Sequence, residues 1–162
     1  MDFNASKIKL VIGLGNPDKE YEKTYHNVGH LFVDYLTTND QRLITKSTEY
    51  MNNSGKYVEK AAKKIGAKPE EILIAQDDSD LEIGKYKLDF ARGSAGHHGI
   101  ESIQQHLKTN DFWRLRIGIR PANEAPPAGG RLKAGDFVLK KISAADMATL
   151  KKVFEEVIEK LK

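Results

Sequence analysis

Apolar and polar residues alternate along this chain with two different periods. Short apolar runs and strict alternation predict strands over residues 8–13, 42–46, 71–76, 85–91, 113–120 and 136–141. Apolar residues spaced three or four apart predict helices over residues 28–37, 56–65, 99–107 and 144–162. Strands that alternate with helices are typical of α/β proteins. We therefore predict one α/β domain over residues 1–162, with a mixed, largely parallel sheet and helices on both faces.

The 113–120 strand has the most regular alternation. Its apolar side chains are expected to face one side of the sheet, while Arg114, Arg116 and Arg120 face the other. The segment that follows, 121–135, is rich in Pro, Ala and Gly and is predicted to be a loop.

Composition narrows the class of protein. The chain has 162 residues, of which 40% are hydrophobic and 30% are charged, as expected for a soluble globular domain. It contains no cysteine, which excludes disulfides and thiolate catalysis. No apolar run approaches the ~20 residues of a membrane span, and the first residues do not resemble a secretory signal, so we expect a cytoplasmic protein. A net charge of +3 is compatible with a polyanionic partner but does not require one.

A first polar cluster follows the 8–13 strand. The strand runs into Gly13-Leu14-Gly15-Asn16-Pro17, and Tyr21 and His26 come shortly afterwards. Gly13 and Gly15 permit backbone angles that other residues resist. Ligands commonly bind at the carboxyl ends of strands in open α/β sheets, and a histidine there can act as a base.

Two other interpretations of this cluster remain open. His26 can be a surface residue, with Asn27 capping the helix over 28–37. The two glycines also begin a dinucleotide-binding fingerprint, but Asp18 stands where its third glycine belongs.

A second polar cluster follows the strand over 71–76. Asp77 lies at the expected carboxyl end of this strand, where a carboxylate can orient a histidine and stabilise its protonated form. Together with Asp78 and Asp80 it could instead bind Mg²⁺ or Ca²⁺, although the glycine and distal glutamate of a calcium loop are missing. We interpret Asp78 and Asp80 as a solvated acidic turn.

Two further motifs precede predicted helices. In Met51-Asn52-Asn53-Ser54-Gly55, either Asn53 or Ser54 is expected to cap the helix, which leaves the Asn52 side chain available for function. The loop Gly93-Ser94-Ala95-Gly96-His97-His98-Gly99 allows close backbone approach to a ligand, and the start of a helix favours anions. Its two histidines raise the possibility of zinc, but neighbouring residues rarely bind one ion and further ligands are not suitably spaced.

In this order and combination, these motifs resemble the bacterial-type peptidyl-tRNA hydrolase family. The matching segments are GLGNP (13–17) with Tyr21, HNVG (26–29), MNNSG (51–55), Asp77, GSAGHHG (93–99) and RLRIGIRP (114–121). The resemblance extends from Lys9 to about Lys141. It implies a monomeric enzyme without a cofactor that hydrolyses the ester between peptide and tRNA, with peptidyl-tRNA as its partner.

The resemblance also implies roles for individual residues. His26 would be the general base that activates water, and Asp77 would orient it. The expected substrate-binding residues are Asn16, Tyr21, Met51, Asn52, His97 and His98. Asn16 and Asn52 would position the substrate end and the water, Tyr21 would lie near the tRNA terminus, and Met51 would line the peptide groove. Basic residues near the site would hold phosphates.

The chain departs from the family pattern at several positions. His98 stands where the family usually has an asparagine, and the region 38–50 and the C-terminal tail are shorter than usual. A basic position before the glycine-rich loop is Asp89 or Ala91 here, which weakens one expected phosphate contact. These departures motivate an alternative function, a non-catalytic RNA-binding protein on the same fold.

Overall fold

The computed structural model of the protein describes residues 1–36, 41–122 and 133–162. Within these residues lies a five-stranded sheet in the order β2-β1-β3-β5-β4. The strands are β1 (Leu10–Gly13), β2 (Leu43–Lys46), β3 (Ile72–Glu82), β4 (Tyr86–Phe90) and β5 (Trp113–Arg120). Neighbouring strands are parallel except for β4, which pairs with β5 in the antiparallel direction.

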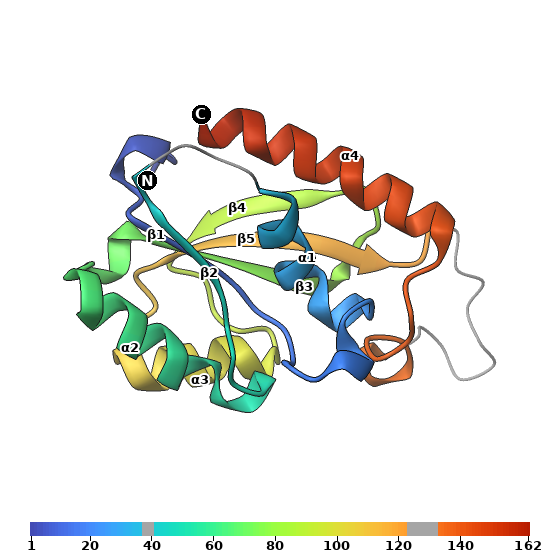
Figure 1. Cartoon of the computed structure of the whole chain (residues 1–162), viewed down its shortest axis with the longest axis horizontal. Helices are drawn as coiled ribbons and strands as arrows, with labels where there is room; N and C mark the ends of the chain where they lie inside the picture. Colours follow the sequence, from blue (N-terminus) through green and yellow to red (C-terminus); the bar gives the residue numbers. More distant parts are fainter. Residues whose placement is uncertain (37–40, 123–132) are drawn as a thin grey trace.

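Two pairs of helices cover the two faces of this sheet (Figure 1). The helices are α1 (Val28–Tyr35), α2 (Ser54–Ile65), α3 (His98–Leu107) and α4 (Ala144–Leu161). Apolar residues of α2 and α3 pack with Leu10, Ile12 and Ile74 on one face. On the other face, apolar residues of α1 and α4 pack with Val11 and Leu73. The prediction of a single α/β domain with a mixed, largely parallel sheet and helices on both faces is confirmed.

The polar clusters meet where β1 and β3 lie side by side. From β1 the chain passes through α1 to β2 on one side, and it then returns through α2 to β3 on the other. The pairing of β1 with β3 ends at Gly13 and Ala75. Beyond Ala75, β3 continues beside β5 alone. Such a switch point, at the carboxyl ends of parallel strands, is where α/β sheets bind ligands.

Glycines let the first turn of α1 pack directly on the end of β1. A Cβ atom on Gly13 would lie 2.2 Å from the carbonyl oxygen of Gly29, and one on Gly29 would lie 2.3 Å from that of Ala75. Neither Gly13 nor Gly15 has a positive φ. These glycines therefore serve by providing room and not through unusual backbone angles, and a Cβ on Gly15 would meet the ring of His30 at 2.7 Å.

Two predicted elements differ from the structure. The strand predicted over 71–76 runs on to Glu82, so Asp77 lies within the strand and not after it. The strand predicted over 136–141 is wrong, because Ala134–Asp136 form a 3₁₀ turn and only Lys141 makes an isolated bridge, to Thr24. Backbone carbonyls of this segment accept hydrogen bonds from the chain around His26. These bonds take the place of the hydrogen-bond ladder between paired strands. Most of the predicted loop over 121–135 lies outside the described residues.

Across the described ranges, no helix combines the length and apolar character that a membrane span requires.

Candidate active site

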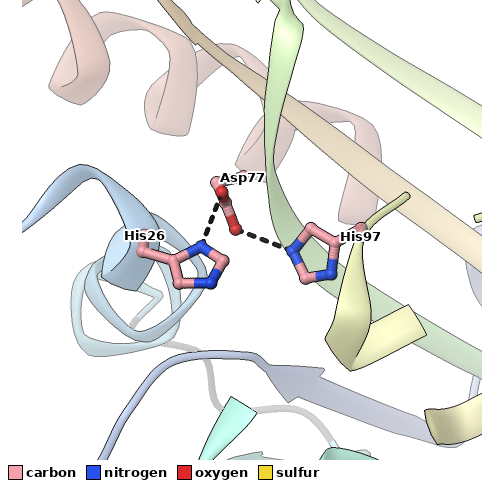
Figure 2. Close-up of side chains that lie close together, drawn as sticks. All are labelled: His26, Asp77 and His97. Carbon is pink, nitrogen blue, oxygen red and sulfur yellow. Dashed lines mark hydrogen bonds and ion pairs between the residues drawn. The ribbon is translucent and has the colours of Figure 1, made fainter. Parts of the chain in front are cut away.

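One carboxylate joins two histidines at the switch point (Figure 2). The Nδ1 atom of His26 lies 2.8 Å from Oδ2 of Asp77. The Nε2 atom of His97 lies 2.8 Å from Oδ1 of the same carboxylate. The sequence predicts the contact between His26 and Asp77, but not the contact between His97 and Asp77. Asp77 is thus held from both sides, in the middle of β3.

The hydrogen bonds fix the position of the protons on the two rings. The Nδ1 atom of His97 accepts from the backbone N–H of Ile100 at the start of α3, over 3.3 Å. The proton of a neutral His97 is therefore on Nε2, which donates to Asp77. A carboxylate only accepts, so Nδ1 of His26 is also a donor. The Nε2 atom of a neutral His26 is then left with a lone pair, which is the requirement for a base.

Burial and charge act in opposite directions on these groups. Asp77 is only 2% exposed. Burial disfavours its charged form, but the charges of His26 and His97 and their hydrogen bonds outweigh burial and hold the pKa of Asp77 well below its usual range. Burial would likewise lower the pKa of His26, yet the charge and hydrogen bond of Asp77 raise it above the ordinary value for histidine. Asp77 therefore stays ionised at neutral pH.

His26 is positioned by its backbone as well as by Asp77. It lies in a 3₁₀ turn, Tyr25–Asn27, directly before α1. Its backbone N–H donates to the carbonyl of Val138 over 2.7 Å. The segment around Val138, where a strand is predicted, thus braces the histidine from a distant part of the chain.

Asn27 fastens the loop after β1. Its Oδ1 accepts from the backbone N–H of Asn16, and its Nδ2 donates to the carbonyl of Asn16, both over 2.9 Å. Its side chain makes no capping bond to α1, so the capping interpretation of Asn27 is wrong. Side-chain capping of α2 is also wrong, because Asn53 makes no such bond and Ser54 donates to the carbonyl of Met51.

Asn16 and Met51 are joined directly. The Oδ1 atom of Asn16 accepts from the backbone N–H of Met51 over 2.8 Å. Met51 is buried, and a Cβ on Gly99 would lie 2.6 Å from its sulfur and 3.0 Å from the ring of His97. The absence of a side chain at Gly99 thus lets the Met51 turn and the His97 loop come together.

A cavity of about 340 Å³ opens beside the two histidines. It is lined by His26, Asp77, His97 and His98, together with Asp78, Asp80 and the backbone around Ala134. The other residues expected to bind substrate, Asn16, Tyr21, Met51 and Asn52, are not among its lining residues. Tyr21 is half-buried in the turn Lys19–Tyr21, and Asn52 is exposed next to Met51. Of the residues expected to bind substrate, the structure therefore places His97 and His98 in one cavity with His26 and Asp77.

Buried arginines hold the loop that carries His97. Arg114 is 1% exposed, and it donates to Oε1 of Gln76 over 2.6 Å and to the carbonyls of Arg92 and Gly93 over 2.9 and 2.6 Å. Burial and the charge of Arg116 lower the pKa of Arg114 to about 10, so it remains charged at neutral pH. The sequence does not predict this role. The alternation in the strand shows on which side an arginine lies, but not which groups it contacts.

Arg116 also binds carboxylates within the protein. It donates to Asp78 over 2.7 Å and to Asp89 over 2.6 Å. The interpretation of Asp78 as a solvated residue is therefore wrong, because it is buried in this ion pair.

The described part of the chain contains one group of residues that could hold a metal ion, namely His26, Asp77 and His97, whose ligand atoms lie within 4.8 Å of one another. The hydrogen bond from Ile100 to Nδ1 of His97 places a proton on Nε2, and a protonated nitrogen cannot bind a metal. The arrangement therefore favours proton transfer over metal binding.

Comparisons with known proteins point to one family. A family model described as peptidyl-tRNA hydrolase matches residues 10–42 and 37–162. The peptidyl-tRNA hydrolase of Cupriavidus metallidurans is 40% identical over 82% of this chain and 79% of its own length. That of Aquifex aeolicus is 36% identical over 94% of this chain and 85% of its own length. The crystal structure of peptidyl-tRNA hydrolase from Acinetobacter baumannii matches 99% of this chain and 89% of its own, with a TM-score of 0.79 and 30% identity.

Proposed function

The chain belongs to the peptidyl-tRNA hydrolase family, and we propose that it hydrolyses the peptide–tRNA ester with Nε2 of His26 as the general base. The observation that carries this assignment is the 2.8 Å hydrogen bond between Nδ1 of His26 and Asp77, because it directs the unprotonated nitrogen away from the carboxylate. Hydrolysis of peptidyl-tRNA itself is the activity of the family.

The proposed reaction proceeds in two steps. Nε2 of His26 takes a proton from water as the water oxygen attacks the ester carbonyl carbon, which gives a tetrahedral intermediate. The intermediate then collapses and the bond to the ribose oxygen breaks. The proton held on Nε2 passes to that oxygen, so the products are the free peptide acid and the tRNA hydroxyl. Asp77 holds the ring in place and stabilises the imidazolium between the two steps.

We assign the stabilisation of the developing oxyanion to side-chain amides. Asn16 uses its Oδ1 to accept from Met51, which leaves its Nδ2 as a donor. Within the described ranges, no protein group accepts from this Nδ2. Asn52, exposed beside Met51, would supply a second donor. Fixed donors of this kind stabilise charge that appears only in the transition state.

The remaining residues would contact the substrate around this centre. His98 lines the cavity and would contact the substrate there, Met51 would border the peptide, and Tyr21 would lie near the tRNA terminus. His97, through its bond to Asp77, would position the carboxylate as well as the substrate. We further propose that the shorter 38–50 region leaves the peptide groove more open. The monomeric state and the cytoplasmic location stay predictions.

The decisive experiment follows release of the blocked amino acid from an N-blocked aminoacyl-tRNA. We expect release by the wild type and a loss of roughly 10²- to 10⁴-fold in His26→Ala. A matched control is His106→Ala, because His106 is an exposed histidine near the end of α3 that contacts none of these residues. Release that His26→Ala leaves undiminished contradicts the assigned base. A wild type that binds tRNA but releases nothing supports the alternative, a non-catalytic RNA-binding protein.

A further inference from the structure

We propose that a groove between β2 and α2 binds the phosphodiester backbone of the tRNA substrate through Lys56, Lys60 and Lys64. This proposal rests on the proposed function, since it assumes that the substrate is a peptidyl-tRNA. It assigns a nucleic-acid contact to a surface outside the site described above.

The groove is a distinct feature of the molecule. It has a volume of about 430 Å³ and lies between the edge strand β2 and helix α2. Thr45 on β2 and Tyr57 on α2 form its floor and are joined by a 2.7 Å hydrogen bond between their hydroxyl oxygens. Figure 1 shows that β2 and α2 run beside one another at the outer side of the sheet.

Three lysines form a row along the groove. Lys56, Lys60 and Lys64 line it, and all three are exposed. Residues four apart lie on the same face of a helix and rise ~6 Å per step, a spacing suited to successive phosphates of one strand. No carboxylate forms an ion pair with any of the three in the described ranges, whereas the neighbouring Lys63 pairs with Glu59. Glu49 is the one acidic residue in the lining, so the groove has an excess of positive charge.

Two arginines of β5 that lie near the site offer little for phosphates to bind. Arg114 is buried under the His97 loop, and Arg116 is neutralised by Asp78 and Asp89. The cavity beside His26 is itself lined by three aspartates, Asp77, Asp78 and Asp80. Arg114 and Arg116 are thus withdrawn from solvent, whereas the three lysines on α2 are exposed to it.

The position of the row is compatible with a substrate held at His26. Helix α2 begins directly after the Met51–Asn53 turn, which is bonded to Asn16. Lys56 lies four residues after Asn52, in the first turn of α2. A strand whose end is bound beside Asn52 can therefore continue along α2 and place its phosphates opposite the lysines.

The test compares two triple variants that each lose three positive charges. Lys56→Gln/Lys60→Gln/Lys64→Gln removes the row, and Lys151→Gln/Lys152→Gln/Lys160→Gln changes exposed lysines of α4 on the opposite face of the sheet. Binding of deacylated tRNA is measured at several salt concentrations, together with the KM for N-blocked aminoacyl-tRNA. Thermal unfolding of both variants verifies that the fold is retained.

We expect the α2 variant to bind tRNA at least about tenfold more weakly at low salt, with the slope of log Kd against log salt reduced by about 2 to 3. The α4 variant should stay close to the wild type. Equal losses in both variants, or no loss in the α2 variant, overturn the proposal. A KM that rises while affinity for deacylated tRNA is unchanged also overturns it, because the groove would then hold the peptide. An inactive wild type contradicts the proposed function alone, since tRNA binding is still measured.

Discussion

The Nδ1 atom of His26 and the Oδ2 atom of Asp77, from residues 51 positions apart in the chain, meet over 2.8 Å. The other oxygen of Asp77 accepts from His97 over the same distance. One carboxylate therefore orients two imidazoles. A residue that replaces Asp77 must supply two acceptor oxygens to keep both rings in place.

Asp77→Asn should reduce kcat by about 10³- to 10⁴-fold. Asparagine has one acceptor oxygen and one donor group, so it cannot accept from both rings, and one imidazole must turn or change tautomer. Because the charge of Asp77 raises the pKa of His26, the acid limb of the pH–rate profile should also move to lower pH in this variant. Rates measured from pH 5 to 9 test both effects. An acid limb that stays in place would show that Asp77 does not control the protonation of the base.

The stability of the protein should depend on His26 in a definite pH window. The pKa of His26 is raised in the folded state, so the attraction between its charged form and Asp77 contributes fully below the unfolded pKa of about 6.5. This contribution is lost as the pH rises through the folded pKa, although the neutral ring keeps its hydrogen bond. The free energy of unfolding of the wild type minus that of His26→Gln should therefore be larger at pH 6 than at pH 9. Urea unfolding at the two pH values measures this difference. A difference that is the same at both values refutes the linkage.

Gly29→Ala should destabilise the protein by about 1–3 kcal/mol or more, since its Cβ would lie 2.3 Å from the backbone oxygen of Ala75, which cannot move without disturbing β3. The matched control is Gly93→Ala, which meets nothing within 4 Å. Chemical denaturation of the two variants measures the contrast. Equal stabilities would mean that α1 does not need its close contact with the sheet.

Arg114→Met should destabilise the protein by about 3 kcal/mol, because it leaves the carbonyls of Arg92 and Gly93 and the amide oxygen of Gln76 without their donor. It should also lower kcat, since the loop that brings His97 to Asp77 loses its support. Arg114→Lys should recover part of the stability but less of the rate, because an ammonium group cannot reproduce the fork of a guanidinium. Denaturation and single-turnover rates separate the two effects. A variant that keeps its full rate would show that the loop is positioned by other contacts.

Elements with a clear period are predictable from this sequence. Helix α2 ends at Gly66, as expected, because its φ of 67° suits a left-handed cap. Strand β5 follows its alternation, with Leu115 and Ile117 in the core beneath α4. Both elements depend on local propensity and on one buried face, and a single sequence records these directly.

Features that rest on long-range pairing are not predictable in this way. The end of β3 is rich in aspartates and therefore resembles a turn, yet it continues as a strand because Arg116 and two histidines satisfy its buried carboxylates. Asn27 has the side chain of a helix cap but bonds Asn16 instead. In each case the deciding partner lies far away in sequence, where periodicity gives no information.

Asp77 and His97 lie in parts of the molecule that differ in their stability against local unfolding. The backbone of Asp77 lies in register with Ile117 on β5, in the middle of the sheet, whereas His97 follows an exposed loop fastened mainly through Arg114. In native-state hydrogen exchange, central strands open only with the whole molecule, while loops open locally at much lower cost. The contact between Asp77 and His97 should therefore open first on the side of the loop. We expect activity to be lost on warming before the sheet unfolds.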